Sequence, residues 1–309
     1  MCIEIRNEIL NLMDDQIMKP MVTIGLCVKN SEETVREAIT CIVNQEFPDD
    51  NMEVIVVDGC SQDQTLSIIK EGLSKRAIKL RIFSESTGLG FARQVVVDNA
   101  LGKYIVWVDG DILLSPQYIE EQVVFMEQNP RVAIAIGSYG LISNNNWIAL
   151  LESIGYVIES LKHNGKETSN FLGTRGSIFR VSAIKSVGGF DLTIIGAQED
   201  LDVSRKISSI GWKLFVTNST FYEKQKTTWN AIWERHYWYG YGLHFIKHKH
   251  KERNLFIDKS NDRIIISSLA YKLTHRKVVF LLPLNFVLRK IALLFGFLKS
   301  HFDEYGHNC

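Results

Sequence analysis

From Met21 onward, short apolar runs rich in β-branched residues alternate with segments of helical periodicity, and this alternation is the feature that most restricts the fold. It is typical of strands joined by crossover helices, which form a parallel sheet. The runs contain few polar residues, which indicates strands buried on both faces. The sequence therefore predicts an α/β protein with a Rossmann-like, mostly parallel sheet flanked by helices, and its strands are expected at residues 22–28, 53–58, 79–84, 103–109 and 132–137.

Helices are expected between these strands. The first is the clearest, because Asn30 can cap it, Glu33 follows three residues later, and apolar residues then recur at helical spacing from Val35. Beyond residue 140 the alternation fades and a helix-rich tail follows. Further helices are predicted after Ser61 and at 90–100, 116–128, 146–162 and 200–209, with strands at 177–181 and 212–216.

Composition excludes several classes of protein. The 309-residue chain carries 35 basic and 35 acidic side chains, and this balance removes the electrostatic basis for a dedicated nucleic-acid binder. Its 46% hydrophobic and 23% charged residues are typical of a globular protein. Five cysteines, an odd number without a CxxC pair, favour a reducing compartment. Acidic residues interrupt the first twenty positions, so we expect a helical extension at 1–20, no signal peptide and a cytoplasmic protein.

The C-terminal region, residues 226–309, is expected to be helical and partly hydrophobic. Its two apolar stretches, 278–288 and 291–298, are separated by a basic pair, and each is shorter than the about 20 residues that a spanning helix needs. The basic run at 247–253 and the basic pair at 276–277 suit a peripheral helix on an anionic membrane surface. A helix packed on the protein's own core, with its charges solvated, explains the same pattern equally well.

Aspartates at strand ends are the first candidates for chemistry, because ligands of open α/β sheets bind beyond the carboxyl ends of the strands. Asp58 ends the second predicted strand, and Asp109 and Asp111 follow the fourth with Gly110 between them. Two carboxylates this close repel each other unless a divalent cation is nearby. The pair indicates Mg²⁺ or Mn²⁺, which completes its coordination with phosphate oxygens. Two solvated aspartates in a turn are the alternative, and the position directly after an apolar strand favours the metal site.

The glycine-containing segment at 86–104 is a second candidate. It lacks the third glycine of a dinucleotide-binding loop, because Arg93 stands in that place. Arg93 can clamp a phosphate through its planar guanidinium. Its alternative is a surface ion pair with Asp98 or Glu85.

A third acidic group, Glu199 and Asp200, opens a predicted helix. Negative charge stabilises a helix N-terminus, so helix capping alone explains these residues. A carboxylate at the rim of a cleft can also take the proton of an attacking hydroxyl. Both hypotheses stay open on the residues themselves.

Histidines carry weaker signals. His236 lies in the aromatic stretch WERHYWYGYG, where packing in the core or at a membrane interface is favoured over substrate contact. His248 and His250 lie among lysines, and we interpret them as a solvated face, not a metal site, because no carboxylate or thiolate partner is evident.

Taken in order, these motifs resemble the family 2 glycosyltransferases of the GT-A fold over about residues 21–222. The order and spacing carry the resemblance, and the matching segments are VTIGLCVKNSEETVREAITCIVNQ, VIVVDGCSQDQT, GLGFARQ, YIVWVDGD, GTRGSIFR, SVGGFD and QEDLDVSRKISSIGWKL. It implies a GT-A domain at 21–225, with a nucleotide-binding half at about 21–137 and an acceptor half at about 138–225. It also implies an inverting, hexosyltransferase-type enzyme that uses a nucleotide-diphosphate sugar and Mn²⁺ or Mg²⁺.

The resemblance assigns the donor nucleotide to the first half of the chain. Asp58 matches the aspartate that contacts the nucleotide base, and the strand end from Thr23 to Lys29 forms part of that pocket. Arg93 lies where the family has an arginine beside the diphosphate. Asp109 matches the first acid of the DxD motif, which meets the ribose and the metal.

The metal, the sugar and the acceptor follow in the same way. Asp111 is implied as the more direct metal ligand, and Asp200 matches the usual general base, with Glu199 beside it. Three consecutive residues match the segment that lines the donor sugar and the acceptor, namely Gly173, Thr174 and Arg175.

The chain departs from the family pattern in three places. Glu223 stands near the position where the family often has a histidine close to the metal, and a carboxylate can still bind a hard cation. The QxxRW box of processive members is absent, since residues 234–238 read ERHYW. The family's VDDGS keeps only its first acid, at Asp58.

Two other functions fit the nucleotide-binding pattern. A sugar-phosphate nucleotidylyltransferase would have a glycine-rich loop after its first strand, where this chain reads CVKNSEET. A non-catalytic sugar-nucleotide-binding protein would not need the full set of acids. For the acceptor we favour a glycan or lipid-linked glycan at the cytoplasmic face of a membrane, because the tail is hydrophobic.

Overall fold

The computed structural model describes residues 19–142, 146–194, 196–250 and 263–303. The helical extension expected at residues 1–20 lies, apart from its last two residues, outside the described residues. The same holds for the second half of the basic run at 247–253.

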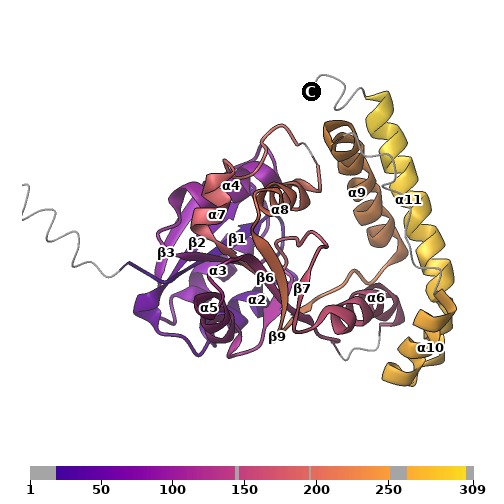
Figure 1. Cartoon of the computed structure of the whole chain (residues 1–309), viewed down its shortest axis with the longest axis horizontal. Coiled ribbons are helices and arrows are strands. Elements are labelled where there is room, and N and C mark those ends of the chain that lie inside the picture. Colours follow the sequence, from indigo (N-terminus) through magenta and orange to yellow (C-terminus); the bar gives the residue numbers. More distant parts are fainter. Residues whose placement is uncertain (1–18, 143–145, 195, 251–262, 304–309) are drawn as a thin grey trace, which may run out of the picture.

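The first half of the chain forms the parallel part of the sheet, in the order β3–β2–β1–β4. Every residue of the two central strands is buried, as the apolar runs predict. Figure 1 shows this part in indigo and purple. The strands are β1 (Val22–Val28), β2 (Met52–Asp58), β3 (Lys79–Ser84) and β4 (Tyr104–Trp107).

The second half adds strands of mixed direction. β8 (Ser177–Arg180) pairs antiparallel with β4 and with β6 (Val132–Tyr139), and β6 pairs in parallel with β9 (Lys213–Glu223). Two short strands, β5 (Ile112–Leu114) and β7 (Lys166–Thr168), pair with β9. Neither strand is predicted from the sequence, because three residues are too few to show a strand period.

Helices cover both faces of the sheet. Alternate residues of β2 show how: Val54 and Val56 belong to one core, and Ile55 and Val57 belong to the other. The first core contains α2 (Val35–Val43), α3 (Thr65–Leu73) and α5 (Tyr118–Gln128). The second contains α4 (Leu89–Asn99), α7 (Val181–Ser186) and α8 (Glu199–Ser209).

The predicted cap of the first helix is wrong. α2 begins at Val35, and its N-cap residue Thr34 makes no side-chain capping bond. Asn30 instead has a left-handed backbone, with φ of 45°. Its Oδ1 accepts from the Gln62 backbone N at 2.9 Å, and its own N donates to Ser61 Oγ at 2.9 Å. Asn30 therefore ties the loop after β1 to the loop after β2.

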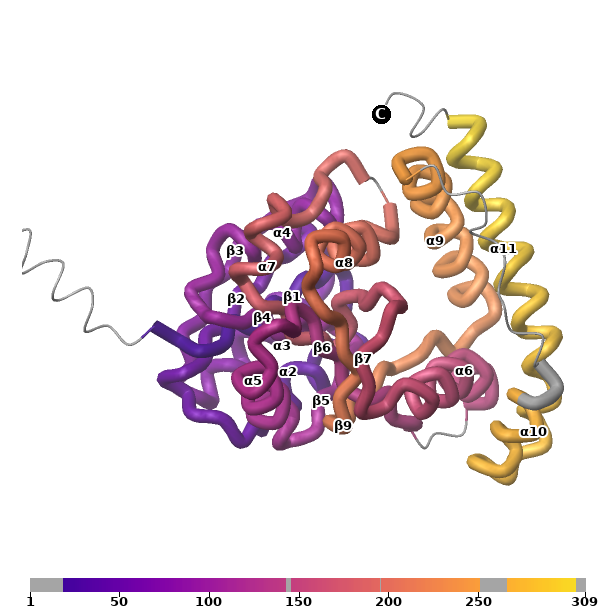
Figure 2. The backbone as a smooth tube through the Cα atoms, in the orientation of Figure 1, coloured from indigo at the N-terminus to yellow at the C-terminus, as the bar shows by residue number. Residues whose placement is uncertain are grey.

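The C-terminal region is helical, as predicted, and lies on one side of the sheet (Figure 2). Two glycines set the closest approach of α9 to α11. A Cβ atom on Gly240 would lie 1.9 Å from Leu293 O, and one on Gly296 would lie 1.8 Å from Tyr237 O. The elements of this region are α9 (Trp229–His250), α10 (Arg263–Thr274), η2 (Lys277–Leu281) and α11 (Leu282–Phe302), and they pack against α6 (Trp147–His163) from the middle of the chain.

The two apolar stretches of the tail are not separate. They join into one helix, because Pro283 falls in its first turn, where proline is tolerated. Within the described residues, Lys277–Phe302 is the one helical segment long and apolar enough to cross a membrane by length and composition. Only 22% of the residues in its most apolar 18-residue stretch are buried.

A buried carboxylate connects three of these helices. Glu152 on α6 is fully buried, and its carboxylate lies 3.3 Å from His236 Nε2 and accepts from Asn285 Nδ2 at 3.2 Å. Arg289 Nε lies 3.7 Å from the same carboxylate. Burial opposes the charge, but the His236 hydrogen bond and the Arg289 charge keep the pKa of Glu152 below its usual range. Glu152 therefore links α6 to α9 and α11.

We expect Glu152→Ala to lower the free energy of unfolding by about 3 kcal/mol, because it leaves two basic partners without their buried carboxylate. Glu159→Ala on the same helix is the control: its side chain is 54% exposed, and its removal should change stability by less than about 0.5 kcal/mol. Urea unfolding of both variants measures the difference. Equal stability of the two would contradict the role given to Glu152.

Candidate active site

A large cavity opens between the carboxyl edge of the sheet and α9. Its volume is about 1340 Å³, which exceeds the roughly 300–1,000 Å³ of a site for one small ligand. It therefore has room for two substrates side by side. The loops after β1 and β4, the segment before β8, the start of α8, the end of β9 and the first half of α9 all contribute to its lining.

Arg93 is the central charged group at the base of this cavity. The side chain is 5% exposed and forms a close ion pair with Glu199. Its Nη2 lies 3.5 Å from Asp109 Oδ1, and its Nη1 lies 4.0 Å from Asp200 Oδ2. Burial disfavours the charge of Arg93, but the three carboxylates outweigh burial and raise its pKa above the usual value. The surface ion pair with Asp98 or Glu85 is therefore not formed.

Asp200 faces the cavity from the first turn of α8. Its Oδ2 accepts from the Thr174 backbone N at 3.2 Å. A Cβ atom on Gly173 would lie 2.6 Å from the same oxygen, so a side chain at 173 would displace the carboxylate. Gln198, which precedes the helix, has φ of 87°, a strained value for a residue with a side chain. The backbone on both sides thus fixes where Asp200 points.

The acids after β4 lie close to the end of β9. The Lys224 backbone N donates to Asp111 O at 2.9 Å, which brings Asp111 beside Glu223. Burial, together with the charges of Glu223 and Asp109, raises the pKa of Asp111 to about 7. Crowded carboxylate oxygens of this kind fit a hard divalent cation, which would relieve their repulsion. The donor set therefore suits Mn²⁺ or Mg²⁺.

Glu223 also has a second set of contacts. Its carboxylate accepts from Arg175 Nη1 at 3.0 Å and from Arg235 Nη1 at 3.3 Å. The Tyr139 hydroxyl donates to it at 3.3 Å. Glu223 therefore holds two cationic side chains at the cavity wall.

The structure brings most of the predicted site residues to this cavity. Thr174 lies just beneath its surface, fully buried, and contributes its backbone N–H to Asp200. The predicted residues that line the cavity are Lys29, Arg93, Asp109, Asp111, Gly173, Arg175, Glu199, Asp200 and Glu223.

Two predicted nucleotide-binding residues do not line the cavity. Thr23 is fully buried near the start of β1, away from the carboxyl end, and its Oγ1 donates to Glu53 Oε1 at 2.6 Å. Asp58 lies at the correct end of β2 but is only 2% exposed. Its carboxylate accepts from Ser61 N at 3.0 Å and from Ser61 Oγ at 2.6 Å. Asp58 thus shapes the loop after β2, while Thr23 stabilises the opposite end of the strands, away from the cavity.

The part of the cavity wall that α9 provides was not predicted from the sequence. Arg235, Trp238 and Tyr239 line the cavity from α9, and their spacing of three and four residues in the aromatic stretch was the available signal. Tyr156 on α6 and Phe171 add further aromatic surface. His236 packs away from the cavity against Glu152, as the sequence favoured.

Comparison with known proteins gives a consistent result. The sequence model of glycosyl transferase family 2 matches residues 23–188. An uncharacterized glycosyltransferase of Haemophilus influenzae is 34% identical over 122 residues, which are 39% of this chain and 36% of that protein. Poly(ribitol-phosphate) beta-N-acetylglucosaminyltransferase TarS of Staphylococcus aureus is 30% identical over 113 residues, 36% of this chain and 20% of TarS. The aligned segment thus spans about a third or less of these two relatives.

Solved structures match over more of the chain. Mannosyltransferase PcManGT from Pyrobaculum calidifontis, in complex with GDP-Man and Mn²⁺, has a TM-score of 0.63 at 17% identity and covers 92% of this chain and 88% of its own. S. aureus TarS 1–349 in complex with UDP has a TM-score of 0.54 at 17% identity, covering 92% and 91%. At this identity the likeness concerns the fold, and it confirms the predicted GT-A type with its C-terminal helices.

Proposed function

The chain belongs to glycosyl transferase family 2, and on this basis we propose that it transfers a sugar from a nucleotide-diphosphate sugar to an acceptor hydroxyl. The observation that carries the proposal is the convergence of Arg93, Asp109, Asp111 and Asp200 at one cavity large enough for both substrates. The relatives support it, since one is named as an N-acetylglucosaminyltransferase and another was solved with GDP-Man and Mn²⁺.

Asp200 is the proposed general base. It takes the proton of the acceptor hydroxyl, whose oxygen attacks the anomeric carbon from the face opposite the leaving diphosphate, so that the configuration inverts. The Thr174 N–H donates to Asp200 Oδ2 at 3.2 Å and the Leu201 N–H donates to Oδ1 at 2.8 Å, so both oxygens of the proposed base are held in place. Glu199 is a positioning residue in this scheme, because it is 1% exposed and bound to Arg93.

The proposed binding site for the donor diphosphate combines a metal site with basic side chains. Asp111, with Asp109, would hold Mn²⁺ or Mg²⁺, and the ion would supply positive charge that stabilises the leaving diphosphate. The Arg93 guanidinium lies between the carboxylates of Asp109 and Asp200 and holds them near each other. Arg175 and Arg235 present further positive charge beside the metal-binding acids, where Glu223 holds both.

The exposed surface of α11 supports the proposal that the protein binds a membrane. From Arg263 to Phe302 the sequence has seven basic and no acidic residues. Apolar side chains exposed by 41–63% recur along this segment at helical spacing, namely Phe280, Leu284, Val287, Ile291, Leu294, Phe295 and Leu298. An apolar stripe among basic residues suits an anionic leaflet. The chain is thus proposed to lie peripherally on the cytoplasmic face, where a lipid-linked glycan can reach the cavity.

Replacing the proposed base tests the reaction. We expect Asp200→Asn to lower turnover by about 10²- to 10⁴-fold, because no carboxylate remains to take the proton, while the donor dissociation constant stays within about twofold. A screen of nucleotide sugars identifies the donor, and product formation with that donor measures turnover.

A second variant moves the carboxylate without removing it. Gly173→Ala should also lower turnover, because the new methyl group displaces Asp200 Oδ2. Gly155→Ala is the matched control, since its Cβ meets only ordinary contacts at 3.9 Å, and it should keep full activity. Normal turnover in Asp200→Asn would remove this residue as the base.

Metal dependence has its own test. Calorimetry of UDP and GDP binding with and without Mn²⁺ should show tighter binding with the metal, and Asp111→Ala should lose this gain because a main ligand is gone. Asp98→Ala, an exposed acid on α4, is the control and should keep the gain. An undiminished Mn²⁺ effect in Asp111→Ala would refute the assignment.

Membrane docking is tested by co-sedimentation with vesicles. The full-length protein should bind vesicles rich in phosphatidylserine more than neutral ones, and Leu284→Glu or Phe295→Glu should weaken binding, since each buries a charge in the apolar layer. Val124→Glu on α5, where the native side chain is 47% exposed, is the matched control and should bind normally. Equal sedimentation of all variants would argue against docking through α11.

A further inference from the structure

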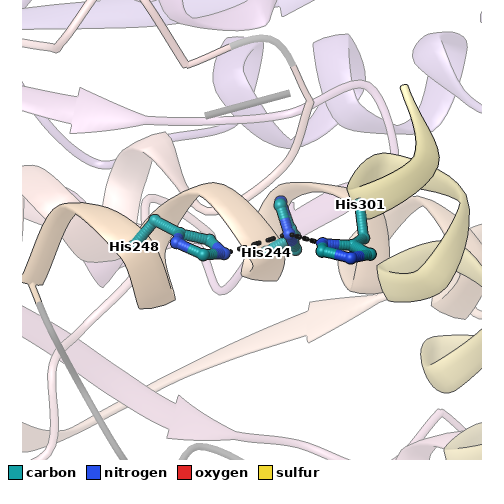
Figure 3. Close-up of side chains that lie close together, drawn as sticks. All are labelled: His244, His248 and His301. Atoms are coloured by element: carbon teal, nitrogen blue, oxygen red, sulfur yellow. Dashed lines mark hydrogen bonds between the residues drawn. The ribbon is translucent and has the colours of Figure 1, made fainter. Parts of the chain in front are cut away.

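Three histidines meet where α9 lies against α11, outside the active-site cavity. His244 and His248 are one helical turn apart on α9, and His301 is in the last turn of α11 (Figure 3). His248 Nε2 lies 3.1 Å from His244 Nε2, which lies 3.3 Å from His301 Nδ1. One nitrogen from each ring falls within 4.8 Å of the others.

We propose that His244, His248 and His301 bind a divalent transition-metal ion, with Zn²⁺ the best fit. Zinc binds imidazole nitrogen at about 2.0–2.1 Å in tetrahedral geometry, which places two ligand nitrogens about 3.3–3.4 Å apart. The two printed nitrogen separations are already close to this value. Two histidines at positions i and i+4 of one helix are also a known metal-binding spacing.

Burial supports a site that an ion can enter. His244 is fully buried at the base, whereas His248 and His301 are exposed. The Phe297 ring packs edge-on against His244, with centroids 4.9 Å apart, and restricts its orientation. Three nitrogen ligands and an open side leave the fourth tetrahedral position to water.

The site is distinct from the one proposed for sugar transfer. Arg235 lines the cavity, and His244 lies nine residues later, or two and a half helical turns, which is the opposite face of α9. The chemistry differs as well, because imidazole selects zinc, copper or nickel, while the carboxylates at Asp109 and Asp111 select magnesium or manganese.

His248 is exposed, as the sequence interpretation of a solvated face expects, but the expectation that His250 has no carboxylate partner is wrong. His250 Nε2 lies 2.7 Å from Asp202 Oδ1, so a carboxylate partner exists for it. His248 turns toward His244 instead. The partner that completes the cluster, His301, is more than fifty residues away in the chain, which no local pattern could reveal.

A metal at this site would join α9 to α11. α9 forms a wall of the cavity, and α11 carries the exposed apolar stripe, so the ion would fix one relative to the other. Because the ion binds the folded protein, it should raise the melting temperature.

The test uses the full-length protein after removal of metal with a chelator. To keep the carboxylate site out of the measurement, Asp111→Ala serves as the background. Titration with Co²⁺, a coloured substitute for Zn²⁺, should produce visible absorption bands that saturate at one equivalent, and Zn²⁺ should bleach them. Zn²⁺ should also raise the melting temperature.

Single substitutions identify the ligands. His248→Ala and His301→Ala, both at exposed positions, should each weaken Zn²⁺ binding by at least about tenfold and abolish the melting-temperature increase. His163→Ala on α6 is the control and should leave both unchanged. Absence of a Co²⁺ spectrum, or Zn²⁺ affinity unchanged in both variants, would overturn the proposal and leave the sugar-transfer scheme untouched.

Discussion

The buried guanidinium of Arg93 is the interaction on which the rest of the active site depends. It stands on α4, while the acids that surround it come from the end of β4 and the start of α8. Without that positive charge, three carboxylates would face one another in a region of low dielectric. Val96 and Val97 pack into the core and thereby fix the position of α4, which carries Arg93. The hydrophobic core therefore also fixes the arrangement of the charges.

α9 connects the catalytic half of the molecule to its C-terminal helices. One face carries the aromatic and cationic wall of the cavity, and the opposite face meets α11 through Gly240 and the histidine cluster. Glu152 joins the same helix to α6. A helix held on several sides is a stable wall for a binding cavity.

Local patterns predicted much of this protein. The apolar runs predict β1, β2, β3 and β6, and the sequence alone identifies the acids after β4 and at the start of α8 as candidate site residues. These features are local. A strand buried on both faces needs a continuous apolar run, and acids at its end are next to that run in the sequence. Thr23 and Asp58 were assigned by resemblance, and the structure shows neither lining the cavity, because hydrogen bonds to Glu53 and Ser61 occupy their polar atoms.

The sequence alone predicts the parallel part of the sheet, because buried strands are local patterns, and it predicts the family, because the ordered motifs can be read along the chain. Which side chains meet depends on the tertiary structure. Arg93 and Glu199 are separated by 106 positions, and His244 and His301 by 57. Such pairs form when helices pack against the sheet and against one another, and no residue pattern records which side chains that packing brings together.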